Sequence, residues 1–179
     1  MTHLRIGIPS KGRLAERTSN LLEQAGLDFR RQDRTLFARV RGMPIDITFL
    51  RTDDIPLLCA RGAIDIGITG SDLVAESEAD LLTRLPLGIG RCRMVVAERA
   101  EMSKDDDPQR WSHIDVATKY PALTRRHFAA RGVQAECIKL DGAMELAPAL
   151  GLSGRIVDLV STVATLKANG LGEVEHIAD

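Results

Sequence analysis

The chain has 179 residues, which is enough for one domain or two small lobes with a sizeable core. Lysine and arginine number 24 against 25 aspartate and glutamate, so the net charge is −1, and no basic block predicts nucleic-acid binding. No apolar run approaches the length of a membrane span, and no signal peptide precedes the first predicted strand. Three widely spaced cysteines predict neither a disulfide framework nor a structural zinc site. We therefore expect a cytoplasmic protein without nucleic-acid or membrane partners.

The apolar content and its spacing predict an α/β fold. Aromatic residues make up only 3% of the chain although 44% is apolar, so the core must consist of aliphatic side chains, as in helix-covered sheets. Repeated strand-loop-helix units predict mainly parallel sheets. In chain order, the pattern predicts a strand at 4–8, a helix at 14–25, a hairpin of strands 34–40 and 45–50, a helix from 53 to 61, a buried strand at 64–68, a strand at 92–97, a strand at 114–117, a helix at 122–131, a strand at 135–140, a helix at 143–150, a strand at 155–160 and a helix ending at Asn169.

Two connecting segments have a separate interpretation. The glycines of residues 88–90 are a candidate hinge between two lobes. Residues 101–110 are strongly polar, which predicts a solvated surface turn without chemistry of its own.

The strongest chemical signal lies between residues 158 and 165. Asp158 stands near the end of a predicted strand, and Ser161, Thr162 and Thr165 stand at the start of the next helix. Exposed amides and the helix dipole attract phosphate there, hydroxyl groups add donors, and a carboxylate accepts hydrogen bonds from a ribose diol. The pattern predicts a cradle for a ribose phosphate, although simple capping of the helix by these hydroxyls explains the same residues.

Basic residues near the first strands are candidates for binding phosphates. Lys11 and Arg13 flank Gly12 directly after the first strand, where a flexible backbone can approach an anion. The segment lacks the spacing of known phosphate-binding loops, so a solvated basic turn is the competing interpretation. Arg34 and Arg51 are further candidates, because guanidinium groups stabilise the charge of a leaving pyrophosphate; each taken singly also fits a surface arginine.

Two other junctions carry polar groups. Thr69, Gly70 and Asp72 follow a predicted strand, and the alternative to a ligand site there is a capped turn. Glu145 and Asp141 lie at another strand-to-helix junction, where acids can bind sugar hydroxyls or simply favour the helix dipole. The four histidines have no metal-ligand spacing, so no metal site is predicted.

Five segments together resemble the ATP phosphoribosyltransferase family, and the likeness runs from about Leu4 to about Ile177. Their order along the chain also matches the family. These segments are 11–14, 65–70, 117–121 (Ala-Thr-Lys-Tyr-Pro), 145–148, and 158–162 followed by Thr165 and Leu166.

The resemblance implies a two-lobed fold like that of type II periplasmic binding proteins, with a central cleft. It implies lobe I at residues 1–90, rejoined by about 173–179, and lobe II at 91–172, which carries the loop for the phosphate of phosphoribosyl pyrophosphate (PRPP). It further implies catalytic roles for Lys11, Arg34 and Arg51. The substrate-binding residues that it implies are Arg13, Thr69, Gly70, Asp72, Tyr120, Glu145, Asp158, Ser161, Thr162, Val163, Ala164 and Thr165.

The activity that the resemblance implies is the first step of histidine biosynthesis. ATP and PRPP combine, adenine N1 displaces pyrophosphate from ribose C1, and Mg²⁺ enters with PRPP and leaves with pyrophosphate. The length resembles the short form of the family, which forms homo-oligomers and hetero-oligomers with a regulatory subunit related to histidyl-tRNA synthetase. A catalytically impaired or non-catalytic nucleotide- or phosphate-binding subunit with the same fold is the alternative.

One position departs from the family pattern in the predicted phosphate loop. Val163 stands where the family has glycine. A Cβ atom resists a positive φ and crowds a phosphate that contacts the backbone. The departure therefore predicts weaker PRPP binding if this position requires the conformation of glycine.

Overall fold

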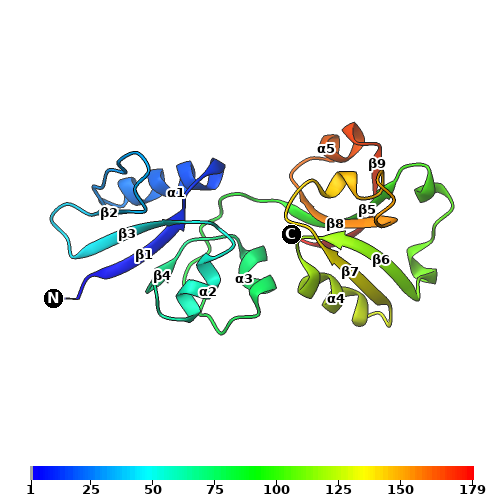
Figure 1. Ribbon diagram of the computed structural model, residues 1–179, viewed down its shortest axis with the longest axis horizontal. Helices are drawn as coiled ribbons and strands as arrows, with labels where there is room; N and C mark the ends of the chain where they lie inside the picture. Colours follow the sequence, from blue (N-terminus) through cyan, green and yellow to red (C-terminus); the bar gives the residue numbers. More distant parts are fainter. Residues whose placement is uncertain (1) are drawn as a thin grey trace. The chain divides into compact units, whose positions relative to one another are not determined.

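The computed structural model describes residues 2–179; Met1, which belongs to the predicted first lobe, lies outside them. The chain divides into two compact units, Met1–Gly90 and Arg91–Asp179. Each unit has its own sheet and its own apolar core (Figure 1). No helix within residues 2–179 has the length and apolar character needed to cross a membrane.

Unit 1 has a four-stranded sheet in the order β2-β3-β1-β4. Strand β1 pairs in parallel with β3 and β4, and β2 pairs antiparallel with β3. The predicted hairpin is therefore confirmed. The elements are β1 (Leu4–Pro9), α1 (Gly12–Gln24), β2 (Phe37–Arg39), β3 (Ile45–Leu50), α2 (Ile55–Ala60), β4 (Ile66–Gly67) and α3 (Ser71–Ser77).

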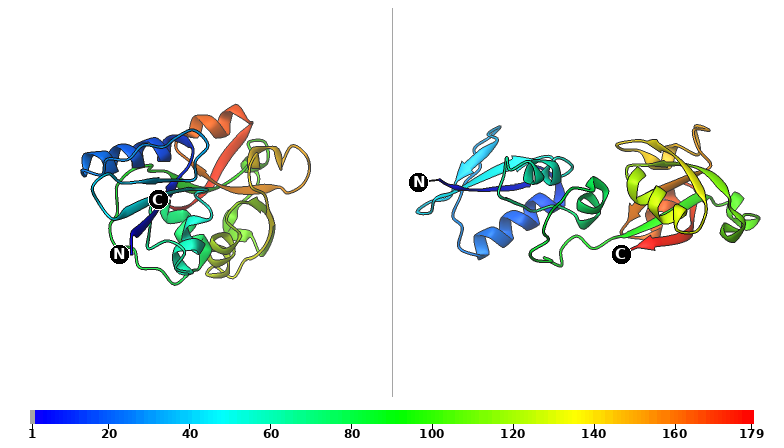
Figure 2. Two further views of the ribbon diagram at one scale, coloured as in Figure 1. Left: turned by 60° about the vertical axis from the view of Figure 1, so that its left-hand side comes forward. Right: turned by 90° about the horizontal axis from the view of Figure 1, so that it is seen from below.

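The alternation of side chains along β1 builds two layers in unit 1. Ile6 and Ile8 point to one face, where they pack with Ile47 of β3 and Leu22 of α1. Helix α1 covers this face, and α2 and α3 lie on the other side of the sheet (Figures 1 and 2). On that second face, a Cβ atom at Gly7 would lie 2.5 Å from a side-chain carbon of Ile64, so glycine allows close packing there.

Unit 2 has a five-stranded sheet in the order β7-β6-β8-β5-β9. Its parallel part consists of β7, β6 and β8, while β5 runs antiparallel to both β8 and β9. The elements are β5 (Arg93–Arg99), the 3-10 turns η1 (Met102–Lys104) and η2 (Pro108–Arg110), β6 (His113–Thr118), α4 (Pro121–Ala129), β7 (Gln134–Lys139), the 3-10 turn η3 (Met144–Leu146), β8 (Arg155–Val160), α5 (Val163–Ala168) and β9 (Leu171–Ala178).

Helices cover both faces of this second sheet (Figure 1). Leu166 of α5 and Met144 of η3 pack with Val95 and Ile156 of the sheet in one core cluster. Helix α4 lies on the opposite face, where its Phe128 is completely buried. The mixed α/β architecture predicted from the aliphatic composition is confirmed in both units.

Three predicted elements differ in the structure. Strand β4 has only two residues, both exposed, instead of a buried strand at 64–68. The predicted helix 143–150 is a 3-10 turn at Met144–Leu146, because Ala143 has a left-handed φ of 54° and Pro148 has no amide hydrogen to donate to the carbonyl of Met144. Residues 171–178 form β9, which pairs with β5 of unit 2. The structure therefore differs from the expectation that residues 173–179 return to the first lobe.

The segment 101–110 is more than a solvated turn, contrary to the prediction. Its Asp106 forms an ion pair with Arg155 of β8 and accepts a hydrogen bond of 2.8 Å from the indole of Trp111. The Arg155 guanidinium stacks 4.3 Å from the centre of the Trp111 ring and lies 3.2 Å from the carboxylate of Glu98, a fully buried residue of β5. We call Glu98, Asp106, Trp111 and Arg155 the buried ionic cluster, after the fully buried Glu98; the other three residues are half-buried.

Within the buried ionic cluster, Glu98 is the residue whose burial is energetically unfavourable. Neither of its carboxylate oxygens has a hydrogen-bond partner within residues 2–179. Burial raises the pKa of Glu98 to about 7, Asp106 adds to the rise, and Arg155 opposes it. A pKa raised above the unfolded value means that the folded state binds the proton more tightly, so the stability gained from protonation is lost as the pH rises through 7.

Replacing Glu98 by glutamine is expected to stabilise the protein at pH 8 by about 2–3 kcal/mol, because the amide has the shape of the protonated acid without its charge. At pH 5, where Glu98 itself is protonated in the folded state, the two proteins should unfold at nearly the same urea concentration. Urea unfolding between pH 5 and pH 8 measures this difference. An equal gain at both pH values would show that the charge of Glu98 is not its cause.

Candidate functional site

Most of the predicted site residues of unit 1 gather at one edge of its sheet. Because β1, β3 and β4 are parallel, their carboxyl ends meet at the same edge. Lys11 and Arg13 follow β1, Arg51 follows β3, and Thr69 and Asp72 follow β4. The structure thus brings together three segments that are far apart in the sequence.

Hydrogen bonds hold the loops of this edge in place. The amide of Ser10 donates to the carbonyl of Leu50 at 2.8 Å, which ties the loop after β1 to the end of β3. The hydroxyl of Thr69 donates to the carbonyl of Thr52 at 3.0 Å, which ties the loop after β4 to the loop after β3. Thr69 therefore has a structural role at this edge whatever it binds.

Glycine is favoured at two positions of this edge, by the backbone conformation of Gly12 and by a close contact at Gly70. Gly12 has a φ of 83°, a left-handed conformation that allows helix α1 to begin directly after the basic loop. A Cβ atom at Gly70 would collide with the carboxylate of Asp72 in the first turn of α3. Glycine at position 70 thus lets this carboxylate fold back against the backbone.

The cations at this edge are exposed. Lys11, Arg13, Arg34 and Arg51 all have solvent-accessible side chains. Arg34 precedes β2, whose amino end lies beside the carboxyl end of β3, because the two strands are antiparallel. Its φ of 64° is unusual for a residue with a side chain. All four predicted cations of unit 1 therefore lie near one edge, open to an anionic ligand.

Sequence reasoning missed a fifth cation at the same edge. Arg31 donates to the carbonyl of Ser10 at 2.7 Å, and its guanidinium lies 4.4 Å from the centre of the Phe49 ring. The contacts fix Arg31 between the loop after β1 and the end of β3. No spacing rule marks it, because the loop that carries it has no regular structure.

In unit 2 the predicted residues gather around the carboxyl ends of β6, β7 and β8. The predicted Asp158 lies on β8 and the predicted Glu145 lies in η3 after β7, while Lys119, which was not predicted, directly follows β6. The amide of Leu159 donates to the Asp158 carboxylate at 2.8 Å. Burial raises the pKa of Asp158, the Leu159 amide opposes the rise, Glu145 adds to it, and Lys119 opposes it. These charge interactions place the three side chains in one electrostatic environment.

Lys119 is the second residue that sequence reasoning missed. It lies inside the Thr-Lys-Tyr-Pro segment, but only Tyr120 was predicted to bind substrate. The structure places Tyr120 in the core, with 4% of its surface exposed, and its amide donates to the Thr118 hydroxyl at 2.9 Å. The same hydroxyl donates to the carbonyl of Val157 at 2.8 Å, so this segment joins β6 to β8 beside Asp158.

The predicted phosphate loop is accessible. All five residues from Ser161 to Thr165 are exposed, and helix α5 begins at Val163. Thr162 precedes the helix in an extended conformation, without a side-chain hydrogen bond that caps it. Its hydroxyl is therefore not used in the capping role that was the alternative explanation for this residue.

Val163 does not have the positive φ that would require glycine at this position. Within residues 2–179, the positive-φ residues other than glycine are Arg34, Glu78 and Ala143, and Val163 is helical with a half-exposed side chain. The valine Cβ therefore causes no backbone strain at this position.

Replacing Val163 by glycine is accordingly expected to change the KM for PRPP by less than about threefold, because no strain is released. The substitution should weaken the short helix α5 by about 0.5 kcal/mol or less. Steady-state kinetics with PRPP as the varied substrate measure the first effect, and thermal unfolding measures the second. A tenfold lower KM would mean that the valine side chain obstructs the ligand.

The two sheets and their loop sites define a class of protein. The fold is that of type II periplasmic binding proteins: the periplasmic aliphatic sulphonate binding protein SsuA from Escherichia coli matches 98% of this chain and 60% of its own with a TM-score of 0.54, at 17% identity. At this identity the likeness shows the fold alone.

Closer relatives identify the family. The family model described as ATP phosphoribosyltransferase (HisG) matches residues 51–179. A protein named ATP phosphoribosyltransferase from Rhodospirillum rubrum is 56% identical over 98% of this chain and 80% of its own length. The ATP phosphoribosyl transferase (HisG:HisZ) complex from Thermotoga maritima contains a chain that is 32% identical, with a TM-score of 0.84 over 98% of this chain and 83% of that chain. The chain belongs to the ATP phosphoribosyltransferase family.

Proposed function

We propose that this protein condenses ATP with PRPP to give N1-(5-phosphoribosyl)-ATP and pyrophosphate, the first step of histidine biosynthesis. Membership of the family supports the proposal. The observation in the structure that carries it is the position of Asp158, a partly buried carboxylate that interacts electrostatically with Glu145 and Lys119 and lies just before the exposed loop 161–165.

The residues of unit 2 suit PRPP. Amides and hydroxyls of the loop 161–165 can bind the 5′-phosphate at the start of α5. Asp158 and Glu145 can accept hydrogen bonds from the ribose hydroxyls, and Lys119 balances their charge. In this proposal the loop holds the phosphate end of the sugar, while the two carboxylates orient the ring.

The residues of unit 1 suit the polyphosphates. We assign Lys11, Arg34 and Arg51 to the developing charge on pyrophosphate, and Arg13, Thr69, Gly70 and Asp72 to the nucleotide. Mg²⁺ belongs to the substrate in this proposal, since it enters with PRPP and leaves with pyrophosphate. The C1–N1 bond forms as the bond from C1 to the pyrophosphate oxygen breaks, so positioning and charge stabilisation suffice without a covalent enzyme intermediate.

We also propose that the protein works in the cytoplasm, in a hetero-oligomer with a regulatory subunit of the HisZ kind. The complex from Thermotoga maritima, in which the 32% identical chain occurs, supports this part of the proposal.

The test is release of pyrophosphate from ATP and PRPP in the presence of Mg²⁺, measured with and without such a partner. Turnover that requires both substrates is expected, and identification of N1-(5-phosphoribosyl)-ATP by mass spectrometry completes the assignment. Absence of turnover in both conditions, combined with intact PRPP binding by calorimetry, would instead support the non-catalytic alternative.

A further inference from the structure

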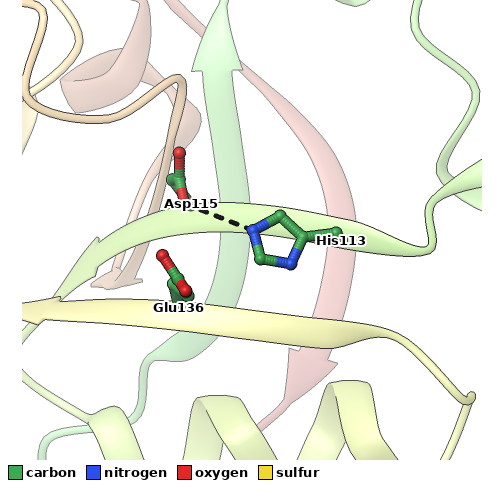
Figure 3. Close-up of side chains that lie close together, drawn as sticks. All are labelled: His113, Asp115 and Glu136. Carbon is green, nitrogen blue, oxygen red and sulfur yellow. Dashed lines mark ion pairs between the residues drawn. The ribbon is translucent and has the colours of Figure 1, made fainter.

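One face of the sheet in unit 2 carries a histidine and two carboxylates that the proposed reaction does not use. They are His113 and Asp115 of β6 and Glu136 of β7 (Figure 3). His113 and Asp115 are two residues apart on a strand, so they share a face, and Asp115 is directly paired with Glu136 in the parallel register. One ligand atom of each residue lies within 4.8 Å of the others.

This triad, His113, Asp115 and Glu136, has an unbalanced charge. Like charges side by side on neighbouring strands destabilise a sheet. Within residues 2–179, no lysine or arginine forms an ion pair with either carboxylate, and His113 Nε2 lies 3.8 Å from Asp115 Oδ1. Arg99, which lines the same surface hollow as Asp115, donates instead to the carbonyl of Pro148 at 2.7 Å. A bound cation would neutralise this negative charge, which no lysine or arginine within residues 2–179 does.

The donor atoms indicate which cation fits. An imidazole nitrogen with two carboxylate oxygens suits zinc, whereas magnesium and calcium favour oxygen ligands alone. Three protein ligands leave a coordination position for water, and the hollow beside Asp115, lined by residues 151–154, is open to solvent. We propose that His113, Asp115 and Glu136 form a surface site for Zn²⁺ or a similar divalent transition-metal ion.

The site is separate from the proposed substrate site in unit 2. The triad lies toward the amino ends of β6 and β7, whereas Lys119 and Glu145 follow their carboxyl ends. Asp115 and Lys119 are four residues apart, which along a strand is about 13 Å. Bound metal would join the edge strand β7 to β6 and would act on the stability of unit 2, not on the chemistry of phosphoribosyl transfer.

Zinc titration of the whole protein, freed of metal with EDTA, tests the site. Calorimetry should show one site that is weakened at least tenfold by His113→Ala and by Glu136→Gln. His176→Ala is the matched control, because His176 is an exposed histidine with one carboxylate partner, Asp179, at 3.0 Å. It should leave zinc binding unchanged. Equal affinity of the wild type and His113→Ala, or no binding up to millimolar zinc, would overturn the proposal.

Two further measurements separate this site from binding by cysteine and from damage to the fold. The Co²⁺-loaded protein should lack a thiolate charge-transfer band; a strong band that persists in His113→Ala would place the metal on cysteine and overturn the proposal. Without metal, Glu136→Gln should melt at or above the wild-type temperature, because it removes a repulsion. Zinc should raise the melting temperature of the wild type but not that of Glu136→Gln, and an equal rise in both would also overturn the proposal.

Discussion

Asp158→Asn is expected to lower kcat/KM for PRPP about 10- to 100-fold, because an amide replaces the charged acceptor assigned to the ribose hydroxyls. The effect should depend on pH. Burial raises the pKa of Asp158, so the carboxylate of the wild type takes up a proton as the pH falls through this raised value. The activity of the wild type should therefore decline over the same pH range. The variant has no carboxylate to titrate, and the difference between the two proteins should shrink at low pH. Initial rates across the pH range measure both effects.

The stability of the same variant serves as the control. A carboxyl group with a raised pKa costs stability when it is ionised, so Asp158→Asn should be at least as stable as the wild type at pH 8. Loss of activity with unchanged stability assigns the effect to the ligand. If activity at pH 8 remained within threefold of the wild type, Asp158 would not hold the ribose.

Arg155→Met is expected to have the largest effect on stability, a loss of about 3–5 kcal/mol at pH 8, because it leaves the buried Glu98 and the half-buried Asp106 without their shared cation. Trp111 is the only tryptophan in the chain and stacks on Arg155, so its fluorescence reports directly on the buried ionic cluster. Urea unfolding followed by this fluorescence measures the loss.

A double substitution identifies the cause. If the unpaired charge of Glu98 destabilises Arg155→Met, adding Glu98→Gln should recover a large part of the loss at pH 8. Recovery should be small at pH 5, where Glu98 is protonated in either background. Without any recovery at pH 8, the lost packing of Arg155 on Trp111 would be the dominant contribution.

Much of the fold was predictable because the local patterns are unambiguous. The alternation of Ile6 and Ile8 on β1 and the helical spacing from Leu14 to Ala25 have one structural interpretation each, and the structure agrees with both. The candidate residues at strand ends were predictable for a related reason. In parallel sheets the carboxyl ends of strands meet at one edge, so Asp158 and Lys11 could be singled out before their neighbours in space were known.

The remainder depends on contacts between distant segments. Asp106 looks solvated in its polar surroundings, and only its partner Arg155, which is 49 residues away, makes it part of a cluster. The position of Lys119 beside Asp158 and Glu145 likewise depends on the order in which strands pair. Strand β9 was missed because its exposed and half-buried residues carry no strong apolar alternation.

Strand β9 is an edge strand of the sheet in unit 2, so its geometry affects how this edge interacts with other molecules. Its pairing with β5 shifts register twice, between Met94 and Val95 and between Val96 and Ala97. Such irregularities bend and twist an outermost strand, so its unpaired amides do not form the straight ladder that a second polypeptide needs for β-sheet addition. A sheet that ends in this way is a poorer template for fibril growth than one whose edge strand is straight.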